Sequence, residues 1–246
     1  MLSWKFIWTV VIPLLGLELY LLVGQIAQLG RHATLFAEDG PVELGTAIFF
    51  VIAGCLAIRI ARSGQGTVPT VYRLFFVLYA LASFFVALEE ISYGQHIFGL
   101  STPEYFALHS TKNEINLHNL YQNRGSNVLH HLANIIFPFC AILLPLGAHL
   151  KHRPYSPDSK SFYLLPRFEL TATVLVAQGV TAIAHVSRAL IGKSVLVRPG
   201  EIQELYWAYA AMLYAAIIYL RAKSTSKASA FPGHSSEAAL ALPVVT

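Results

Sequence analysis

Six segments of this chain are each long and apolar enough to cross a lipid bilayer as a helix, and this constrains the fold more than any other feature. A hydrocarbon layer about 30 Å thick needs roughly 20 helical residues, and a helix satisfies its own backbone hydrogen bonds in lipid. The segments lie near 5–28, 42–62, 71–93, 129–149, 169–190 and 201–221. We therefore predict an all-α, polytopic membrane helix bundle, with one transmembrane domain over residues 1–222. Residues 223–246, rich in Ser, Ala and Pro, are predicted to form a disordered cytoplasmic tail.

Composition supports an integral membrane protein. Charged residues make up 12% of the chain and hydrophobic residues 55%, whereas soluble domains carry about 25% charged residues. The 17 basic residues are scattered, so we predict no nucleic-acid partner. Cys55 and Cys140 lie inside apolar runs, which is typical of small core side chains. The N-terminal segment lacks a small-x-small cleavage site, so we interpret it as a retained first span.

Basic residues set the predicted orientation. With the N-terminus inside, eleven Lys and Arg residues lie on the inner side and six on the outer side, and an excess of Lys and Arg marks the cytoplasmic side. We therefore predict a multi-pass protein of the cell membrane with both termini in the cytoplasm. On this topology nine of the 13 acidic residues and seven of the ten histidines lie at the outer side. The titratable side chains are thus expected to gather at one membrane interface.

Two adjacent glutamates, Glu89 and Glu90, follow an uncharged run over residues 74–88. At the C-terminal end of a helix the macrodipole is negative, so two carboxylates there repel the free carbonyls and each other. This arrangement predicts a neighbouring cation, which would be an arginine, a protonated histidine or a metal ion. Ser83, Ala87 and Glu90 share one helical face. We therefore expect Glu90 to point into the bundle and Glu89 to flank it.

The loop 94–128 is predicted to contain a short interfacial helix. The sequence Ser101–Thr102–Pro103–Glu104 is typical of a capping box with proline in the first turn, and it would open a helix that ends near His109. Further along, Glu114 and His118 have i,i+4 spacing, which in a helix would place them on one metal ion or one proton-transfer chain. The chain has no HExxH, paired ExxH, GxSxG, Walker or GxGxxG pattern.

Candidate ligands lie on the other spans as well. His130 and His131 begin the fourth span, His185 ends the fifth, and Glu43, Glu201 and Glu204 begin the second and sixth. Ionisable groups at this depth are costly unless they are paired, metal-bound or open to water. The three glutamates also have a simpler interpretation, because carboxylates at a helix N-terminus are stabilised by the macrodipole.

From these observations we predict Glu90, Glu114 and His118 as catalytic residues. A divalent metal ion is the cofactor that the cluster would bind, with ligands drawn from Glu43, Glu90, Glu114, His118, His130, His131, His185 and Glu204. Supporting roles are predicted for Glu38, Asp39, Glu89, Asn116, Asn119 and Glu201.

Three blocks of the sequence are similar to a known pattern. They are AEDGPVELGTAIFF (37–50), EEISYGQHIFGLSTPEYF (89–106) and NEINLHNLYQN (113–123). Together they resemble an uncharacterised family of small bacterial multi-span membrane proteins with the blocks EDGxVE, EEISWGQxxFGxxTPE and ExNLHN. The chain departs from this pattern at Tyr93, where the family has Trp, and at His96, where it has a basic or variable residue. The resemblance implies a helical protein of the bacterial inner membrane and carries no activity with it.

Three functions remain open. The first is a membrane-embedded, metal-dependent enzyme that acts on a lipid or lipid-linked substrate at the outer interface. There the pKa values of two neighbouring carboxyl groups separate, so that one group serves as the acid and the other as the base. The second is a proton- or cation-coupled transporter in which Glu18 of the first span passes cations inward. Glu18 otherwise snorkels, or bonds Gln25 and other polar groups across the bundle. The third is a non-catalytic subunit or assembly factor that docks a membrane protein partner through its outer face.

Overall fold

The computed structural model describes residues 3–28, 40–63, 68–110, 113–117, 128–150, 160–166 and 168–230. Within these ranges the chain forms helices and no β-sheet. Six described helical segments are long and apolar enough to cross a membrane: Trp4–Gly24, Pro41–Ala61, Thr70–Glu90, His131–Leu150, Phe168–Ile191 and Pro199–Ser224. The prediction of an all-α polytopic bundle is confirmed.

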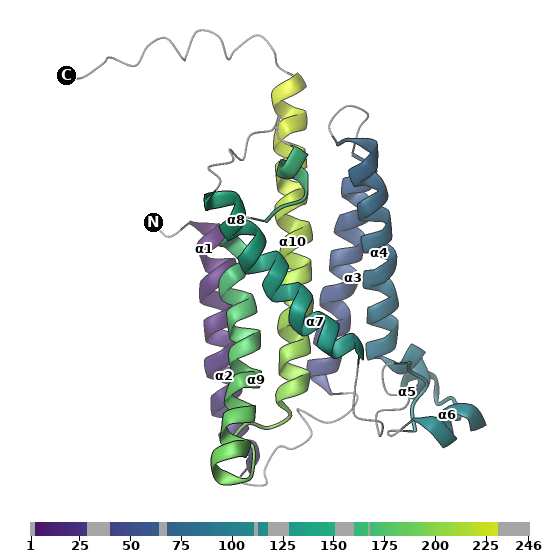
Figure 1. Ribbon diagram of the computed structural model, residues 1–246. Helices are drawn as coiled ribbons and strands as arrows, with labels where there is room; N and C mark the ends of the chain where they lie inside the picture. The colour runs from purple at the N-terminus through teal and green to yellow at the C-terminus, as the bar shows by residue number, and fades with distance from the viewer. Residues whose placement is uncertain are drawn as a thin grey trace, which may run out of the picture.

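The six spans alternate in direction, so α1 begins and α10 ends at the same end of the bundle (Figure 1). The elements are α1 (Trp4–Phe6), η1 (Ile7–Val11), α2 (Ile12–Gln28), α3 (Pro41–Ala61), α4 (Thr70–Glu90), α7 (Val128–Pro138), η5 (Phe139–Leu143), α8 (Leu144–Leu150), α9 (Thr171–Ile191) and α10 (Pro199–Ala230). Helix α10 continues through the region beyond residue 223 that we predicted to be disordered, so that prediction was wrong up to Ala230. Residues 231–246 lie outside the described part.

Helix α10 is the centre of the bundle. On one side Ile218 and Ala222 of α10 pack in a buried cluster with Ala57 and Ile60 of α3. On the other side Trp207 of α10 belongs to a cluster with residues of α9 and α2. Small residues let membrane helices approach closely and pack well. The bundle therefore consists of an α3–α4 hairpin and an α2–α9 pair joined through α10, with the fourth span (α7, η5 and α8) in contact with α9 (Figure 1).

The helix of the first span is interrupted, and a threonine of α9 donates a hydrogen bond to the carbonyl at the interruption. Its π-helical segment η1 ends at Val11, and Pro13 follows two residues later. Proline has no N–H group, so the carbonyl of Thr9, four residues before it, loses its usual helical donor. The hydroxyl of Thr173 donates to that carbonyl at 3.4 Å. In lipid such a freed carbonyl needs a partner from a neighbouring helix.

The fourth span repeats this arrangement. Its π-helical segment η5 ends at Leu143, and Pro145 follows two residues later. The carbonyl of Ala141, four residues before the proline, accepts a hydrogen bond from the hydroxyl of Thr171 at 2.8 Å. Both interrupted spans are therefore held by threonines in the first turn of the same helix, α9.

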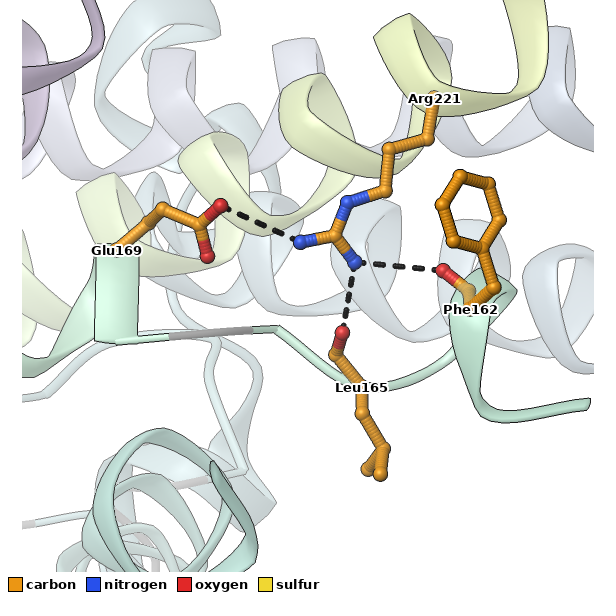
Figure 2. A network of polar contacts seen from close by, with 4 residues as sticks. All are labelled: Phe162, Leu165, Glu169 and Arg221. Atoms are coloured by element: carbon orange, nitrogen blue, oxygen red, sulfur yellow. Dashed lines mark hydrogen bonds and ion pairs between the residues drawn. The ribbon is translucent and has the colours of Figure 1, made fainter. Parts of the chain in front are cut away.

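At the end opposite to α5 and α6, Arg221 of α10 fastens the connection between α8 and α9 (Figure 2). Its guanidinium donates to the carbonyls of Phe162 at 3.3 Å and Leu165 at 2.7 Å, and to Oε1 of Glu169 at 3.3 Å. The two charged side chains are only 12% and 16% exposed. The planar guanidinium can serve three acceptors at once, because its donors point in fixed directions. Arg221 thus fixes residues 162–166 and Glu169 against the central helix.

Candidate functional site

Beyond α4 the chain folds into a compact polar unit, which we call the cap: residues 91–110 and 113–117. It contains η3 (Ser92–Gly94), α5 (Gln95–Phe98) and α6 (Glu104–His109). Ser92, Tyr93 and Gly94 all have left-handed backbone conformations, with φ values of 46°, 54° and 77°. Such conformations are unfavourable for residues other than glycine. The turn carries the chain sideways from the end of α4 (Figure 1).

Glu89 joins α4 to the cap. The phenol of Tyr93 donates to Oε1 of Glu89 at 2.5 Å, and the backbone N–H of Leu117 donates to Oε2 at 2.7 Å. Partial burial and this hydrogen bond raise the pKa of Tyr93 to about 12, so the phenol remains a donor at neutral pH. Glu89 is 4% exposed, whereas Glu90 is half-buried. Our expectation that Glu89 only flanks Glu90 was therefore wrong, because the cap covers the side of α4 that carries Glu89 and makes Glu89 the more buried of the two.

Glu114 lies in a second buried group of the cap. Its Oε2 accepts a hydrogen bond from Nδ2 of Asn116 at 2.8 Å and one from the hydroxyl of Ser92 at 3.3 Å. Asn116 also donates to the Ser92 hydroxyl oxygen at 3.2 Å. Residues 113–117 are not helical. The predicted helical face shared by Glu114 and His118 is therefore not formed over these residues, and His118 itself lies outside the described part.

Gln95 completes the cap. Its Nε2 donates to the hydroxyl oxygen of Thr102 at 2.7 Å, and its Oε1 accepts from the backbone N–H of Ile115 at 2.7 Å. Thr102 in turn donates to the carbonyl of Asn113 at 2.7 Å. Helix α6 has Pro103 at its N-cap with no side-chain capping bond. The predicted short helix is present, but the capping box was wrong because the Thr102 hydroxyl instead donates to the carbonyl of Asn113.

The other predicted ligands begin or end helices at the cap end of the bundle (Figure 1). Glu43, Glu201 and Glu204 are half-buried, while His131 and His185 are exposed. Among the residues that the structure describes, no three His, Cys, Asp or Glu side chains are placed to hold a metal ion. Glu38, Asp39, His118 and Asn119 lie outside the described part, as does the side chain of His130. The metal site therefore stays a prediction.

A cavity of about 500 Å³, which we did not predict from the sequence, lies within the membrane-spanning region. Helix α4 forms one wall and α7, η5 and α8 the opposite wall. The remainder comes from α10, from residues 164–166, from Phe50 of α3, from Leu170 and from Val174 of α9. It is lined by Phe50, Phe75, Tyr79, Ala82, Ser83, Val86, Ile136, Phe137, Cys140, Ala141, Leu144, Leu164, Leu165, Pro166, Leu170, Val174, Ala210, Ala211 and Tyr214. The only sequence signal is that its α4 residues, such as Phe75, Tyr79 and Val86, recur at helical spacing.

The hydroxyl groups in the cavity wall are used within the protein. Tyr79 donates to the carbonyl of Ala211 at 2.9 Å, and Tyr214 donates to the carbonyl of Leu164 at 2.8 Å. Ser83 donates to the carbonyl of Tyr79 at 2.8 Å. These bonds turn the polar atoms toward the backbone and leave mainly carbon atoms facing the cavity. The space is therefore suited to an apolar ligand.

Glu90 follows the cavity-lining part of α4 in the direction of the cap. It follows Val86 by four residues and Ser83 by seven, so the three residues share a face of α4. Val86 and Ser83 line the cavity, and Glu90 lies one helical turn beyond them. The arrangement combines an apolar interior with a carboxyl group at the end nearest the cap.

Comparisons with protein-family models, with curated proteins and with solved structures give no match. What the described geometry defines is an integral membrane helix bundle with a polar cap and an apolar intramembrane cavity.

Proposed function

We propose that this chain binds the hydrocarbon part of an amphiphile, either a membrane lipid or a lipid-linked substrate, between α4 and the α7–η5–α8 span. The cavity carries this proposal. Its volume of about 500 Å³ lies within the range of roughly 300–1,000 Å³ that small-molecule sites occupy. Because the lining hydroxyls are hydrogen-bonded within the protein, the cavity recognises its ligand by apolar contact.

The headgroup of the amphiphile would lie at the cap end of the cavity. There Glu90 offers a carboxylate that accepts hydrogen bonds from a hydroxyl or ammonium group. Glu114 is only 6% exposed inside the cap, so it is less accessible to a headgroup than the half-buried Glu90. If the protein is an enzyme acting on this amphiphile, Glu90 is the carboxylate that would meet the substrate.

The outer surface of the cap supports a position in the lipid interface. Ile97, Phe98, Leu100 and Leu108 are between 52% and 72% exposed. Short helices with such a face lie in the headgroup region with their apolar side chains in the acyl boundary. The cap would then rest at the interface next to the end of α4, where an amphiphile presents its headgroup.

Photolabelling tests the proposal. A phospholipid with a diazirine in its acyl chain is incorporated into vesicles with the protein, irradiated, and the labelled peptides are mapped. We expect strong labelling of residues 75–86 and 136–144 at their cavity-lining positions. Ala82→Trp fills the cavity from α4 and should remove most of that labelling, while Leu81→Trp, at a neighbouring position that is 61% exposed, should not.

Equal labelling of both variants at the cavity positions would refute the binding site. Labelling confined to outward-facing residues such as Leu78 would do the same. Glu90→Gln separates the two parts of the proposal: a change in headgroup preference with unchanged acyl labelling supports the assigned role of Glu90.

A further inference from the structure

Residues 164–166, in the connection between the fourth span and α9, border the cavity at the end opposite to the cap. All three of them line it, and so do Phe75, in the second turn of α4, and Leu170, directly before α9. These helix starts lie at the end of the bundle that is away from α5 and α6 (Figure 1). The connection therefore turns into the bundle, and we call residues 164–166 the end wall.

Hydrogen bonds from α10 hold the end wall in place. The hydroxyl of Tyr214 donates to the carbonyl of Leu164 at 2.8 Å, and the guanidinium of Arg221 donates to the carbonyl of Leu165 at 2.7 Å. Figure 2 shows this carbonyl turned toward Arg221 and the side chain of Leu165 pointing away from it. Phe162, two residues before the end wall, is buried in the cluster formed with α3, α4 and α10. A segment fixed at two successive carbonyls yields little to a ligand that presses on it.

The cavity has the length of one acyl chain. Its lining residues on α4 extend from Phe75 to Val86, and this distance of eleven residues corresponds to about 16 Å along a helix. A hydrocarbon layer of about 30 Å contains two chains end to end, so one chain of ordinary length occupies about 15 Å. A single chain lying along α4 therefore extends from the side nearest the cap to the end wall.

The chemistry of the two ends defines the orientation of such a chain. Glu90 follows the lining part of α4 toward the cap and offers a carboxylate to a headgroup. The end wall consists of two leucines and a proline, and the carbonyls of Leu164 and Leu165 accept hydrogen bonds from α10. Such a surface accommodates the methyl end of a hydrocarbon chain and offers nothing to a charged headgroup.

We propose that the end wall sets the longest hydrocarbon chain that the cavity accepts. This inference rests on the proposed function, because it concerns the same cavity. Lipid tails are as apolar as leucine side chains, so a chain that moves from the bilayer into the cavity gains little from hydrophobicity. Selection among chains is then a matter of packing. A chain that is too long must displace the fixed end wall or fold back, and overfilling a packed space is unfavourable.

Photolabelling by chain position tests the orientation. A single-chain phosphoethanolamine carries a diazirine either at the last carbon of the chain or next to the headgroup, and each probe is irradiated in vesicles with the full chain. The terminal diazirine should label residues 164–166 and Leu170, whereas the diazirine next to the headgroup should label Val86 and Ile136. The reverse pattern would overturn the end wall and leave the binding site standing. No labelling of the cavity by either probe would refute the site itself.

Competition by chain length tests the limit. Single-chain phosphoethanolamines that differ by two methylenes compete with the terminal probe at equal mole fractions in the vesicles. We expect competition to fall about tenfold between the longest chain that fits and the next one. Leu164→Ala shortens the end wall and should move this fall to a longer chain. Val86→Ala, on the cavity lining nearest the cap, is the control and should leave the fall at the same length.

Chain lengths are compared within one variant, so a general loss of stability weakens all of them alike and does not move the fall. Arg221→Met, which releases the carbonyl of Leu165, should make the fall less steep. Competition that shows no fall with the longest chains would overturn the proposal. An equal shift in Leu164→Ala and Val86→Ala would do so too, since the limit would then depend on the volume of the cavity and not on its end.

Discussion

The hydroxyl of Thr171 donates a hydrogen bond to the carbonyl of Ala141, which Pro145 has deprived of its helical donor. This contact ties α9 to the kinked fourth span, and that span forms one wall of the cavity. Thr171→Val removes the donor while keeping the shape of the side chain. We expect a loss of about 1 kcal/mol of unfolding free energy, as for other hydrogen bonds between membrane helices. Denaturation in mixed micelles measures it.

A double-mutant cycle with Pro145→Ala tests the explanation. Alanine restores a backbone N–H at position 145, so the carbonyl of Ala141 regains a donor and Thr171→Val should cost less in that background. Thr70→Val, at an exposed helix start, is the control and should have little effect. If Thr171→Val costs the same with Pro145 and with alanine, the proline is not the reason for the contact.

Arg221 should matter more than other basic residues of α10. Arg221→Met removes three hydrogen bonds and leaves the partly buried Glu169 without its cation. We expect a loss of about 2–3 kcal/mol, since hydrogen bonds to charged groups are strong. Hydrogen exchange of residues 162–166 should rise as the segment separates from α10. Lys223→Met, two residues further on and exposed, should leave both quantities nearly unchanged, and similar behaviour of the two variants would contradict the assigned role.

Substitution of Glu89 should mainly lower stability, whereas substitution of Glu90 should mainly change ligand binding. Glu89→Ala leaves the Tyr93 phenol and the Leu117 N–H without their acceptor, so we expect a loss of about 1–3 kcal/mol and faster hydrogen exchange in the cap. Glu90→Ala should affect stability less, because its side chain is half-buried, and should instead alter headgroup preference. The reverse pattern in the two variants would show that Glu90 holds the cap.

Gly94 and Gly99 form a matched pair for the turn that begins the cap. Both have positive φ values, 77° and 62°. A Cβ atom added to Gly94 would lie 2.8 Å from the ring of Phe98, whereas a Cβ atom added to Gly99 would have no neighbouring atom within 4 Å. Each alanine substitution should cost about 1 kcal/mol for the backbone conformation, and Gly94→Ala should cost more because the ring must move. Thermal unfolding compares them. Equal losses would mean that Phe98 moves freely.

The long spans could be predicted from the sequence because length and hydropathy decide them locally. The predicted second span, 42–62, and the observed helix Pro41–Ala61 differ by one residue at each end. The choice between Glu89 and Glu90 could not be predicted in this way. It depends on the left-handed turn at Ser92 and Tyr93, which folds the cap over Glu89, and residues other than glycine give no sequence signal for such a turn.

The cavity was also beyond the reach of sequence reasoning. Its walls come from segments as far apart as Phe50 and Tyr214, so no local periodicity describes it. Pro138 and Pro145 do signal an interrupted fourth span, but the direction of that interruption depends on the contact with Thr171. Glu18 was visible as a charged residue within the first span, yet only the structure shows that it lies on the outward face of α2.

The central position of α10 has a consequence for the order of assembly. The helix that joins the α3–α4 hairpin to the α2–α9 pair is the last of the six spans to be synthesised. During translation the earlier spans therefore enter the membrane before α10, the helix that holds the α3–α4 hairpin and the α2–α9 pair together, is present. The hairpin can form as soon as α4 is inserted, whereas the complete bundle, its cavity included, must wait until translation has passed Ala222.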